Sequence, residues 1–176
     1  MNFITEQNGP KYRLLNLFGF LICSAAIGFA VVYLQGQLGL EPCPLCTAAR
    51  LFILIQGLLF LLAFVHNPRQ LGQRSYALLG VIAGALGIGV SARHIWLQSL
   101  PADKVPECGP GLDYLLQSFP LADALKIILN GSGECATVQW QLLGLTLPQQ
   151  TLMLFSLLIL ILFAQLKKRR ERHYFS

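Results

Sequence analysis

Four long apolar stretches, separated by polar or turn-rich segments, dominate the pattern along this chain. They cover residues 14–34, 45–65, 75–92 and 150–166. A helix needs about 20 apolar residues to cross a hydrocarbon core of about 30 Å, and all four stretches approach that length. The last is the shortest, so we expect its start to draw on residues 142–147, with Pro148 near the boundary. The pattern predicts an all-α integral membrane protein, a four-transmembrane-helix bundle that forms a single domain over residues 1–176.

Two features refine the spans. Gly80 and Gly84 make a small-xxx-small step in the third stretch, which lets a neighbouring helix approach closely. The first stretch is longer than the apolar core of a secretory signal peptide, and no small-x-small cleavage site follows it. We therefore expect the first stretch to remain as a span and the third to pack tightly against another helix.

Two connecting segments, residues 35–44 and 95–148, are expected on the same side of the membrane. Within the longer one, apolar residues between Leu112 and Leu129 fall mostly three and four positions apart, with Pro120 interrupting them. That spacing is typical of an amphipathic helix. We expect a short amphipathic helix here, lying on the membrane surface.

Composition and charge support the membrane prediction and give it an orientation. The chain is 55% hydrophobic and only 12% charged, which is too apolar for an ordinary soluble domain. The net charge of +5 comes mainly from a cationic tail after the last span, which is typical of a cytoplasmic flank, and we expect no nucleic-acid partner. Of the thirteen Lys and Arg residues, nine lie on the side of the termini and four on the other side. The positive-inside rule then predicts cytoplasmic termini and outward-facing connecting segments.

The motif Cys43-Pro44-Leu45-Cys46 is the strongest chemical signal in the chain. Two cysteines three positions apart can close a small, strained disulfide, which is more oxidising than a long structural one. The motif lies where the second span begins, and the partial positive charge of a helix N-terminus favours the thiolate form, of Cys46 in particular. We therefore predict a redox-active pair.

Arg50 follows Cys46 by four residues, so a helix places both side chains on one face. A cation at that depth is costly and usually functional. It would stabilise the Cys46 thiolate and could meet a polar head group. The alternative is that Arg50 merely extends to the interface and positions the helix.

Cys108 and Cys135 form a second candidate pair, with 26 residues between them in the long outer segment. In isolation they suit a structural disulfide, which would add about 3 kcal/mol by closing a loop. Flexible glycines beside both, and the reactive motif on the same side, favour an exchanging pair instead. A four-cysteine zinc site is a further alternative, but zinc ribbons usually join two short CxxC motifs, so we expect no metal.

The remaining candidates have weaker signals. Cys23 lies in the middle of the first span, where a lone cysteine is most often a small packing residue. His94 lies at the outer end of the third span, either as a ligand for a quinone carbonyl or as an interfacial histidine that reaches water. Trp96 and Trp140 suit an aromatic belt, and Trp140 could also pack on a reactive loop.

With these motifs the chain resembles the disulfide bond formation protein B (DsbB) family over essentially its full length. The four spans, the early CxxC with an arginine four residues later, the late cysteine pair and the segment from Cys135 to Pro148 carry the resemblance. In the related vitamin K epoxide reductase-like proteins the CxxC follows the separated pair, whereas here it comes first. The resemblance implies a protein-dithiol:quinone oxidoreductase of the bacterial inner membrane, with its cysteine segments in the periplasm.

The resemblance also implies roles for the cysteines. Reduced DsbA, a periplasmic dithiol oxidase, would form a mixed disulfide with Cys108, whose partner is Cys135. Cys43 would then exchange with Cys135. Cys46 would be the thiolate that contacts the quinone ring.

The resemblance also implies a quinone cofactor, either ubiquinone or menaquinone, which Arg50 and His94 would hold. DsbA is a strong oxidant at about −120 mV, so only a more oxidising acceptor could regenerate it. A non-enzymatic alternative stays open, namely a four-span membrane protein in which two structural disulfides brace the outer segments. The short CxxC beside Arg50 favours the enzyme.

Overall fold

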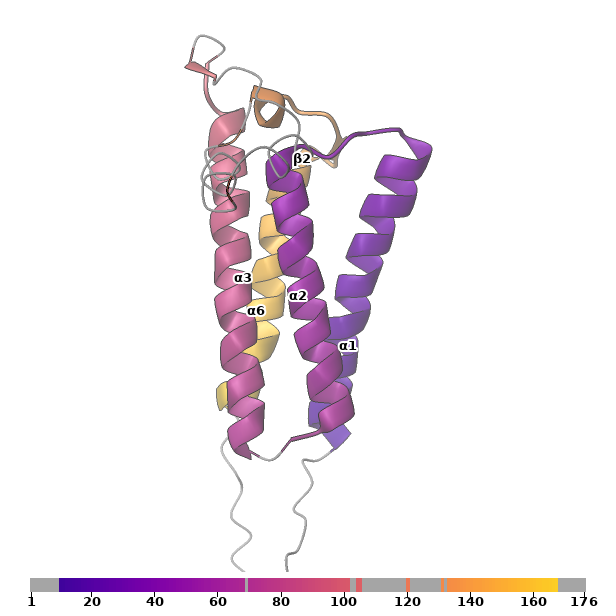
Figure 1. The fold of residues 1–176 in the computed structure, drawn as a ribbon, viewed down its shortest axis with the longest axis vertical. Helices are drawn as coiled ribbons and strands as arrows, with labels where there is room; N and C mark the ends of the chain where they lie inside the picture. Colours follow the sequence, from indigo (N-terminus) through magenta and orange to yellow (C-terminus); the bar gives the residue numbers. More distant parts are fainter. Residues whose placement is uncertain are drawn as a thin grey trace, which may run out of the picture.

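The computed structural model describes residues 10–68, 70–101, 104–105, 120, 131 and 133–167. The first helix, α1 (Pro10–Gly28), continues into a π-helix, η1 (Phe29–Gln37). It is followed by α2 (Pro44–His66), α3 (Gln70–Gln98) and α6 (Leu147–Lys167). These give four apolar helices long enough to cross a membrane, arranged as a bundle in which α1 begins at the end where α6 finishes (Figure 1). The predicted four-helix membrane protein is confirmed.

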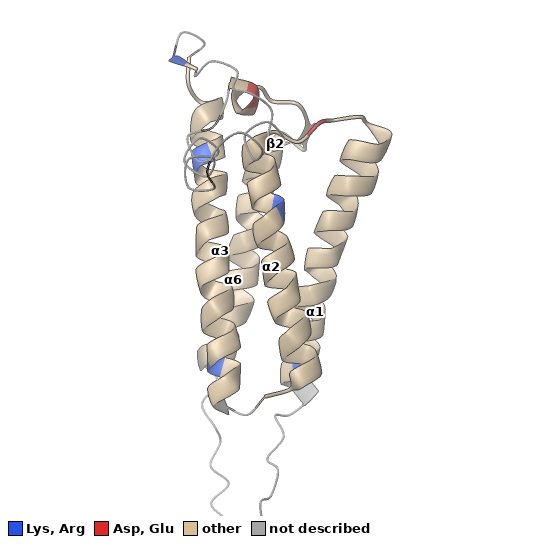
Figure 2. Ribbon diagram, in the orientation of Figure 1, with Lys and Arg blue, Asp and Glu red and all other residues tan. Residues whose placement is uncertain are grey.

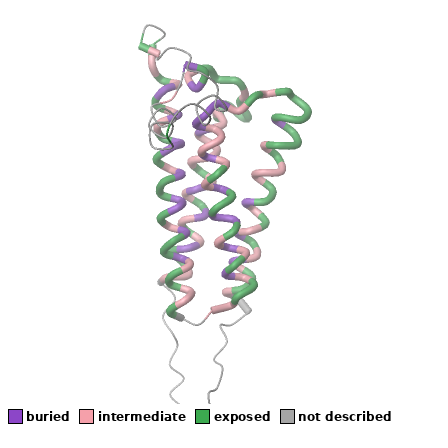
Figure 3. Tube along the Cα trace, in the orientation of Figure 1, coloured by how far each residue is buried: buried purple, intermediate pink, exposed green. Residues whose placement is uncertain are grey.

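The bundle is apolar outside as well as inside. Its outward faces are largely exposed (Figure 3), and Leu14, Leu78 and Leu160 each leave more than half of their surface uncovered. Charged residues lie toward the two ends of the helices, and in the described part of the chain both acids, Glu41 and Glu134, are at the end opposite the start of α1 (Figure 2). An apolar belt between charged ends is the surface that a lipid bilayer requires.

Helix α2 has clear start and stop signals. Cys43 is its N-cap, in extended conformation, and Pro44 takes the first helical position, where its missing N–H costs nothing. At the other end Asn67 adopts the left-handed conformation (φ 41°, ψ 56°) and its N–H bonds to the Ala63 carbonyl. Pro68 follows and cannot continue the helix. The CxxC therefore sits on the first turn of a span, as the sequence predicts.

Helix α3 is longer than the predicted span of residues 75–92. No proline or glycine interrupts it between Gly89 and its end at Gln98, so the helix continues beyond the most apolar stretch. The extension carries His94 at the end of the span, as expected, and places Trp96 on regular helix, whereas the connecting segment was expected to start at residue 95. Arg93 lies over the Trp96 ring, at 4.2 Å from its centre.

A small β-hairpin precedes α6, where the sequence suggested an early start of the last helix. Strand β1 (Gln141–Leu142) pairs antiparallel with β2 (Leu145–Thr146). Leu143 and Gly144 form the turn, with φ of 54° and 78°, a geometry that glycine permits and that matches the twist of a hairpin. The expectation that residues 142–146 extend the last span is therefore wrong, and α6 begins at Leu147, directly before Pro148.

The glycine face of α3 packs on α6. A methyl group added at Gly80 would come within 2.7 Å of Leu162, and one added at Gly84 would come within 2.7 Å of Ile159. At Gly87 it would overlap the ring of Phe155, which is fully buried. The close approach predicted from the small-xxx-small step is confirmed, and α6 is the neighbour.

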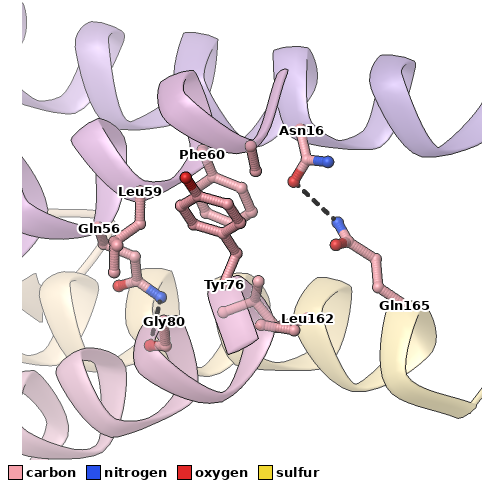
Figure 4. Close-up of a pocket in the computed structure, with 10 residues that line it drawn as sticks. Asn16, Gln56, Leu59, Phe60, Tyr76, Gly80, Leu162 and Gln165 are labelled. Atoms are coloured by element: carbon pink, nitrogen blue, oxygen red, sulfur yellow. Dashed lines mark hydrogen bonds between the residues drawn. The ribbon is translucent and has the colours of Figure 1, made fainter. Parts of the chain in front are cut away.

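Polar side chains also meet inside the bundle, where Asn16 faces Gln165 and Gln56 faces Gly80 (Figure 4). Asn16 and Gln56 are almost completely buried. Gln165 Nε2 donates to Asn16 Oδ1 at 3.3 Å and so joins α6 to α1, and Gln56 Nε2 donates to the Gly80 carbonyl at 3.3 Å and joins α2 to α3. We call these residues, with Tyr76 beside them, the inner polar layer. Its two hydrogen bonds join the four helices in two pairs, α1 with α6 and α2 with α3.

Cys23 packs in the apolar core between α1 and α2 together with Ile53 and Phe60. It is 2% exposed, which agrees with its predicted role as a packing residue. Residues 112–119 and 121–129 of the predicted amphipathic surface helix lie outside the described residues, as does Cys108.

Candidate active site

Cys43 and Cys46 face each other across the first turn of α2, and both are thiols in the structure. The sulfur of Cys43 accepts a hydrogen bond from the main-chain N–H of Cys46 at 3.4 Å. Cys43 thereby caps the helix with its sulfur.

His94 lies between the two sulfurs. Its Nε2 is 3.9 Å from Cys43 Sγ, and its Nδ1 is 3.9 Å from Cys46 Sγ. The side chain comes from α3, 51 and 48 residues along the chain from the two cysteines, and it is 5% exposed. A buried imidazole touching both thiols can hold or pass on a proton from either one.

Cys135 lies next to this group. It belongs to a short 3-10 helix, η3 (Gly133–Ala136), and is fully buried. It shares one apolar cluster with Cys43, Leu45 and Leu97. The structure thus brings three of the four predicted redox cysteines together with His94, whereas Cys108 lies outside the described residues.

Gly131 explains why η3 can approach so closely. It has a φ of 78°, and a methyl group added there would overlap Leu97 and lie 3.2 Å from Leu45. Only glycine combines that conformation with that contact. The glycines before Cys135 were expected to make the chain flexible. Gly131 also has a packing function, because it lets the backbone approach Leu97 and Leu45.

A cavity of about 260 Å³ opens beside Cys46, in the half of the bundle that carries the CxxC. All four helices and η1 contribute to its wall. Most of the lining is apolar, and its polar members include Cys46, Arg50, Ser91, His94, Gln150 and Thr151. Ser91 precedes His94 by one helical turn, and its hydroxyl is buried with no hydrogen-bond partner among the described residues.

Arg50 forms part of this wall and also holds the first helix. Its guanidinium donates to Gln35 Oε1 at 2.9 Å and to the Ala30 carbonyl at 3.2 Å. Both acceptors belong to η1, and π-helical turns often occur at functional sites. Arg50 therefore shares the cavity with Cys46, as its four-residue spacing predicts, and connects α2 to η1 in addition.

A much smaller hollow, about 20 Å³, lies between the CxxC and the segment that leads to the hairpin. Glu134, Gln139 and Trp140 line it together with Cys43 and Cys46. The Trp140 ring also contacts Phe29, with ring centres 5.6 Å apart. Trp140 therefore packs over the reactive motif, which is one of the two positions considered from the sequence.

The family model described as "Disulfide bond formation protein DsbB" matches residues 12–165. The chain belongs to the DsbB family. The match includes every residue of the site just described, so the resemblance seen in the sequence is confirmed.

Curated relatives agree with this assignment. A disulfide bond formation protein B of Nitrosococcus oceani is 50% identical over 143 residues, which cover 81% of this chain and 84% of the relative. One of Psychrobacter sp. is 46% identical over 85% of this chain and 88% of the relative. One of Marinobacter nauticus is 45% identical over 90% and 95%, respectively. The comparison with solved structures found no match.

Two site residues were missed from the sequence. Ser91 could have been found, because its three-residue spacing from His94 places both on the same face of a helix. Gln35 gave no usable signal, because its contact with Arg50 depends on how α1 and α2 cross.

Proposed function

We propose that this member of the DsbB family reoxidises a DsbA-like periplasmic dithiol oxidase and passes the electrons to a membrane quinone. The relay would run through Cys108 and Cys135 to Cys43 and Cys46, and it would support disulfide bond formation. The observation that carries the proposal is the position of the CxxC, which lies at the wall of a cavity inside a membrane bundle and contacts Cys135 at its outer side.

The cavity suits a quinone ring by its chemistry. A quinone is a flat apolar ring with two carbonyl oxygens that accept hydrogen bonds, and it dissolves in the bilayer. The walls are mostly apolar, Arg50 and His94 supply donors, and the Ser91 hydroxyl lacks a partner among the described residues. Either ubiquinone or menaquinone fits this description. When bound, the quinone supplies an acceptor for two electrons and two protons.

The residues of the site provide the thiol chemistry. In thiol–disulfide exchange a thiolate attacks a disulfide sulfur and a second thiolate leaves. Cys43 and Cys135 share one buried cluster, so exchange between the two pairs would take place between neighbouring parts of the site. Closing the Cys43–Cys46 disulfide releases two protons and two electrons, and His94 Nδ1 is placed to take the proton of Cys46 Sγ.

The proposed orientation follows from the distribution of charge. Nine of the thirteen Lys and Arg residues lie on the side of the termini, so that side would face the cytoplasm. The CxxC and Cys135 are at the opposite end of the bundle, which would face the periplasm across the inner membrane of a bacterium.

The decisive experiment supplies the purified protein with reduced DsbA and a quinone. We expect stoichiometric quinone reduction, with one disulfide formed in DsbA for each quinone reduced. A protein whose four cysteines only brace its outer segments would give no turnover, and its disulfides would be the same in membranes with and without quinone. That result would exclude the proposed oxidoreductase.

A further inference from the structure

Three metal-binding side chains converge at the start of α2. One ligand atom each from Cys43, Cys46 and His94 lie within 4.8 Å of one another. Each comes from a fixed position, the cap of α2, its first turn and the body of α3. From the sequence, a zinc site with four cysteines was considered and set aside for its spacing. His94 was not part of it, because His94 is far from the cysteines along the chain.

The distances are close to those of a tetrahedral zinc site. Zinc binds thiolate sulfur at about 2.3 Å and imidazole nitrogen at about 2.0–2.1 Å, so neighbouring ligands of one ion are separated by roughly 3.5–4 Å. Each sulfur is 3.9 Å from a different nitrogen of the His94 ring, and one ligand atom from each of the three residues lies within 4.8 Å of the others. A single ion therefore requires a small inward movement of the sulfurs toward one ring nitrogen. Two thiolates and an imidazole also form a ligand set that favours soft or borderline cations such as Zn²⁺ and Cd²⁺ over Mg²⁺ or Ca²⁺.

Charge balance favours the bound ion as well. Two thiolates at the edge of a membrane bundle are expensive unless a positive charge compensates them. Arg50 is the nearest cation that lines the same cavity, and its guanidinium is already bonded to Gln35 and Ala30. A divalent cation with two thiolates and a neutral imidazole has no net charge.

We propose that the dithiol form of this protein binds one Zn²⁺ or a similar soft divalent cation through Cys43, Cys46 and His94, and that the ion blocks the redox centre. Two metal–sulfur bonds form as the two S–H bonds ionise, and two protons leave to the solvent. No electron is transferred. One nitrogen of the His94 ring provides the third bond, and the fourth position is open to water.

Binding depends on the redox state. In the disulfide the two sulfurs are joined at about 2.05 Å and carry no thiolate charge, so they no longer form a pair of ligands. The cation is therefore an inhibitor of the reduced protein only. It occupies Cys46 Sγ and the His94 ring, both of which line the larger cavity, so it also excludes an electron acceptor from that wall.

The test uses the full-length protein in detergent, reduced and then freed of reductant, with Cd²⁺ as the probe. Cadmium–thiolate bonds give a charge-transfer absorption in the ultraviolet. We expect this band to saturate at one Cd²⁺ per chain at the CxxC and to be missing at this site in the oxidised protein. Zn²⁺ should displace Cd²⁺ and abolish the band.

Variants assign the ligands. Cys46→Ala should lose the site, and His94→Ala should weaken binding by at least about tenfold. His94→Cys keeps a soft ligand and should bind tightly, which covers the case in which His94→Ala does not fold. The matched controls are His66→Ala, an exposed histidine at the other end of α2, and Cys23→Ala, a buried thiol far from the site. Both should bind like the wild type.

Two results would overturn the proposal. One is a reduced wild-type protein that binds no Cd²⁺ at the CxxC, and the other is equal affinity in His94→Ala and His66→Ala. Metal binding is measured without DsbA or quinone, so these results are independent of the proposed oxidoreductase activity. If turnover exists, stoichiometric Zn²⁺ should stop it and a chelator should restore it.

Discussion

At the scale of single residues, Arg50 has two roles, since it lines the cavity and also binds η1. Its guanidinium faces the cavity that Cys46 lines, and it also donates two hydrogen bonds to η1. The planar fork of arginine can satisfy both acceptors at once, whereas the ammonium of lysine is a point charge on a flexible stem. Arg50 therefore shapes the cavity through η1 as well as lining it.

We predict that Arg50→Lys weakens apparent quinone affinity by about tenfold, the effect of losing one hydrogen bond from a charged donor, and that Arg50→Gln weakens it further. Formation of the mixed disulfide between Cys108 and DsbA should be unaffected. The measurement is the apparent KM for quinone at saturating DsbA. Arg93→Lys is the control, because Arg93 stacks on Trp96 and does not line the cavity. If Arg50→Lys behaves like Arg93→Lys, Arg50 is only an interfacial anchor.

Cys108 offers a second test of the proposed relay. We predict that Cys108→Ser abolishes turnover of DsbA, because Cys108 belongs to a long, glycine-containing segment that the sequence predicts to face the soluble partner. The CxxC dithiol should still be reoxidised by quinone, as followed by alkylation of free thiols. A Cys108→Ser protein that oxidises DsbA at the normal rate would contradict the two-pair relay. Cys23→Ala should have no effect on either step.

At the scale of elements, the contact between α3 and α6 depends on missing side chains. Three glycines on one face of α3 allow Phe155, Ile159 and Leu162 to approach its backbone. Gly89 lies on the same helix, but a methyl group added there would meet nothing within 4 Å. The two kinds of glycine in one helix form a matched pair for mutation.

We predict that Gly87→Ala destabilises the bundle by about 1–3 kcal/mol, because the new methyl group overlaps the buried Phe155 ring. Gly89→Ala should be neutral or stabilise the protein by about 0.5–1 kcal/mol, since alanine is the better helix former. The free energy of unfolding can be compared by titrating detergent-solubilised protein with a denaturing detergent. Equal effects of the two substitutions would show that the helix contact is looser than described.

At the scale of the whole molecule, the two ends of the described helical bundle differ from each other in chemistry. One end carries the CxxC, His94 and Cys135, and the other carries the start of α1 and the end of α6. This polarity is what the proposed topology requires.

We predict that, after reduction, a membrane-impermeant thiol reagent labels the protein in intact cells at one or more of Cys43, Cys46, Cys108 and Cys135. A variant that keeps only Cys23 is the control and should stay unlabelled, because Cys23 is 2% exposed within the bundle. Labelling that needs permeabilised cells would reverse the topology and exclude a periplasmic role.

The sequence predicted the spans and the redox motif because both depend on local patterns. Apolar runs identify membrane helices, and the spacing from Cys43 to Cys46 and Arg50 holds within one helix. The position of His94 between the two sulfurs, and the tie from Arg50 to Gln35, depend on how separate helices cross, which a local pattern does not contain. The hairpin before α6 was missed for a different reason, because its turn uses Leu143 at positive φ, which leucine rarely adopts.

The inner polar layer has a consequence for how the protein is made. Asn16 lies in the first helix to leave the ribosome, and its partner Gln165 follows 149 residues later. At a synthesis rate of about 5–20 residues per second, Asn16 waits roughly 7 to 30 s before Gln165 exists. During that time its side-chain oxygen lacks its final partner in a lipid environment, where unsatisfied polar groups are costly. The last helix therefore supplies the hydrogen-bond partner that the first helix needs. A chain that stops before α6 keeps Asn16 without this partner, and we expect membrane proteases to degrade it.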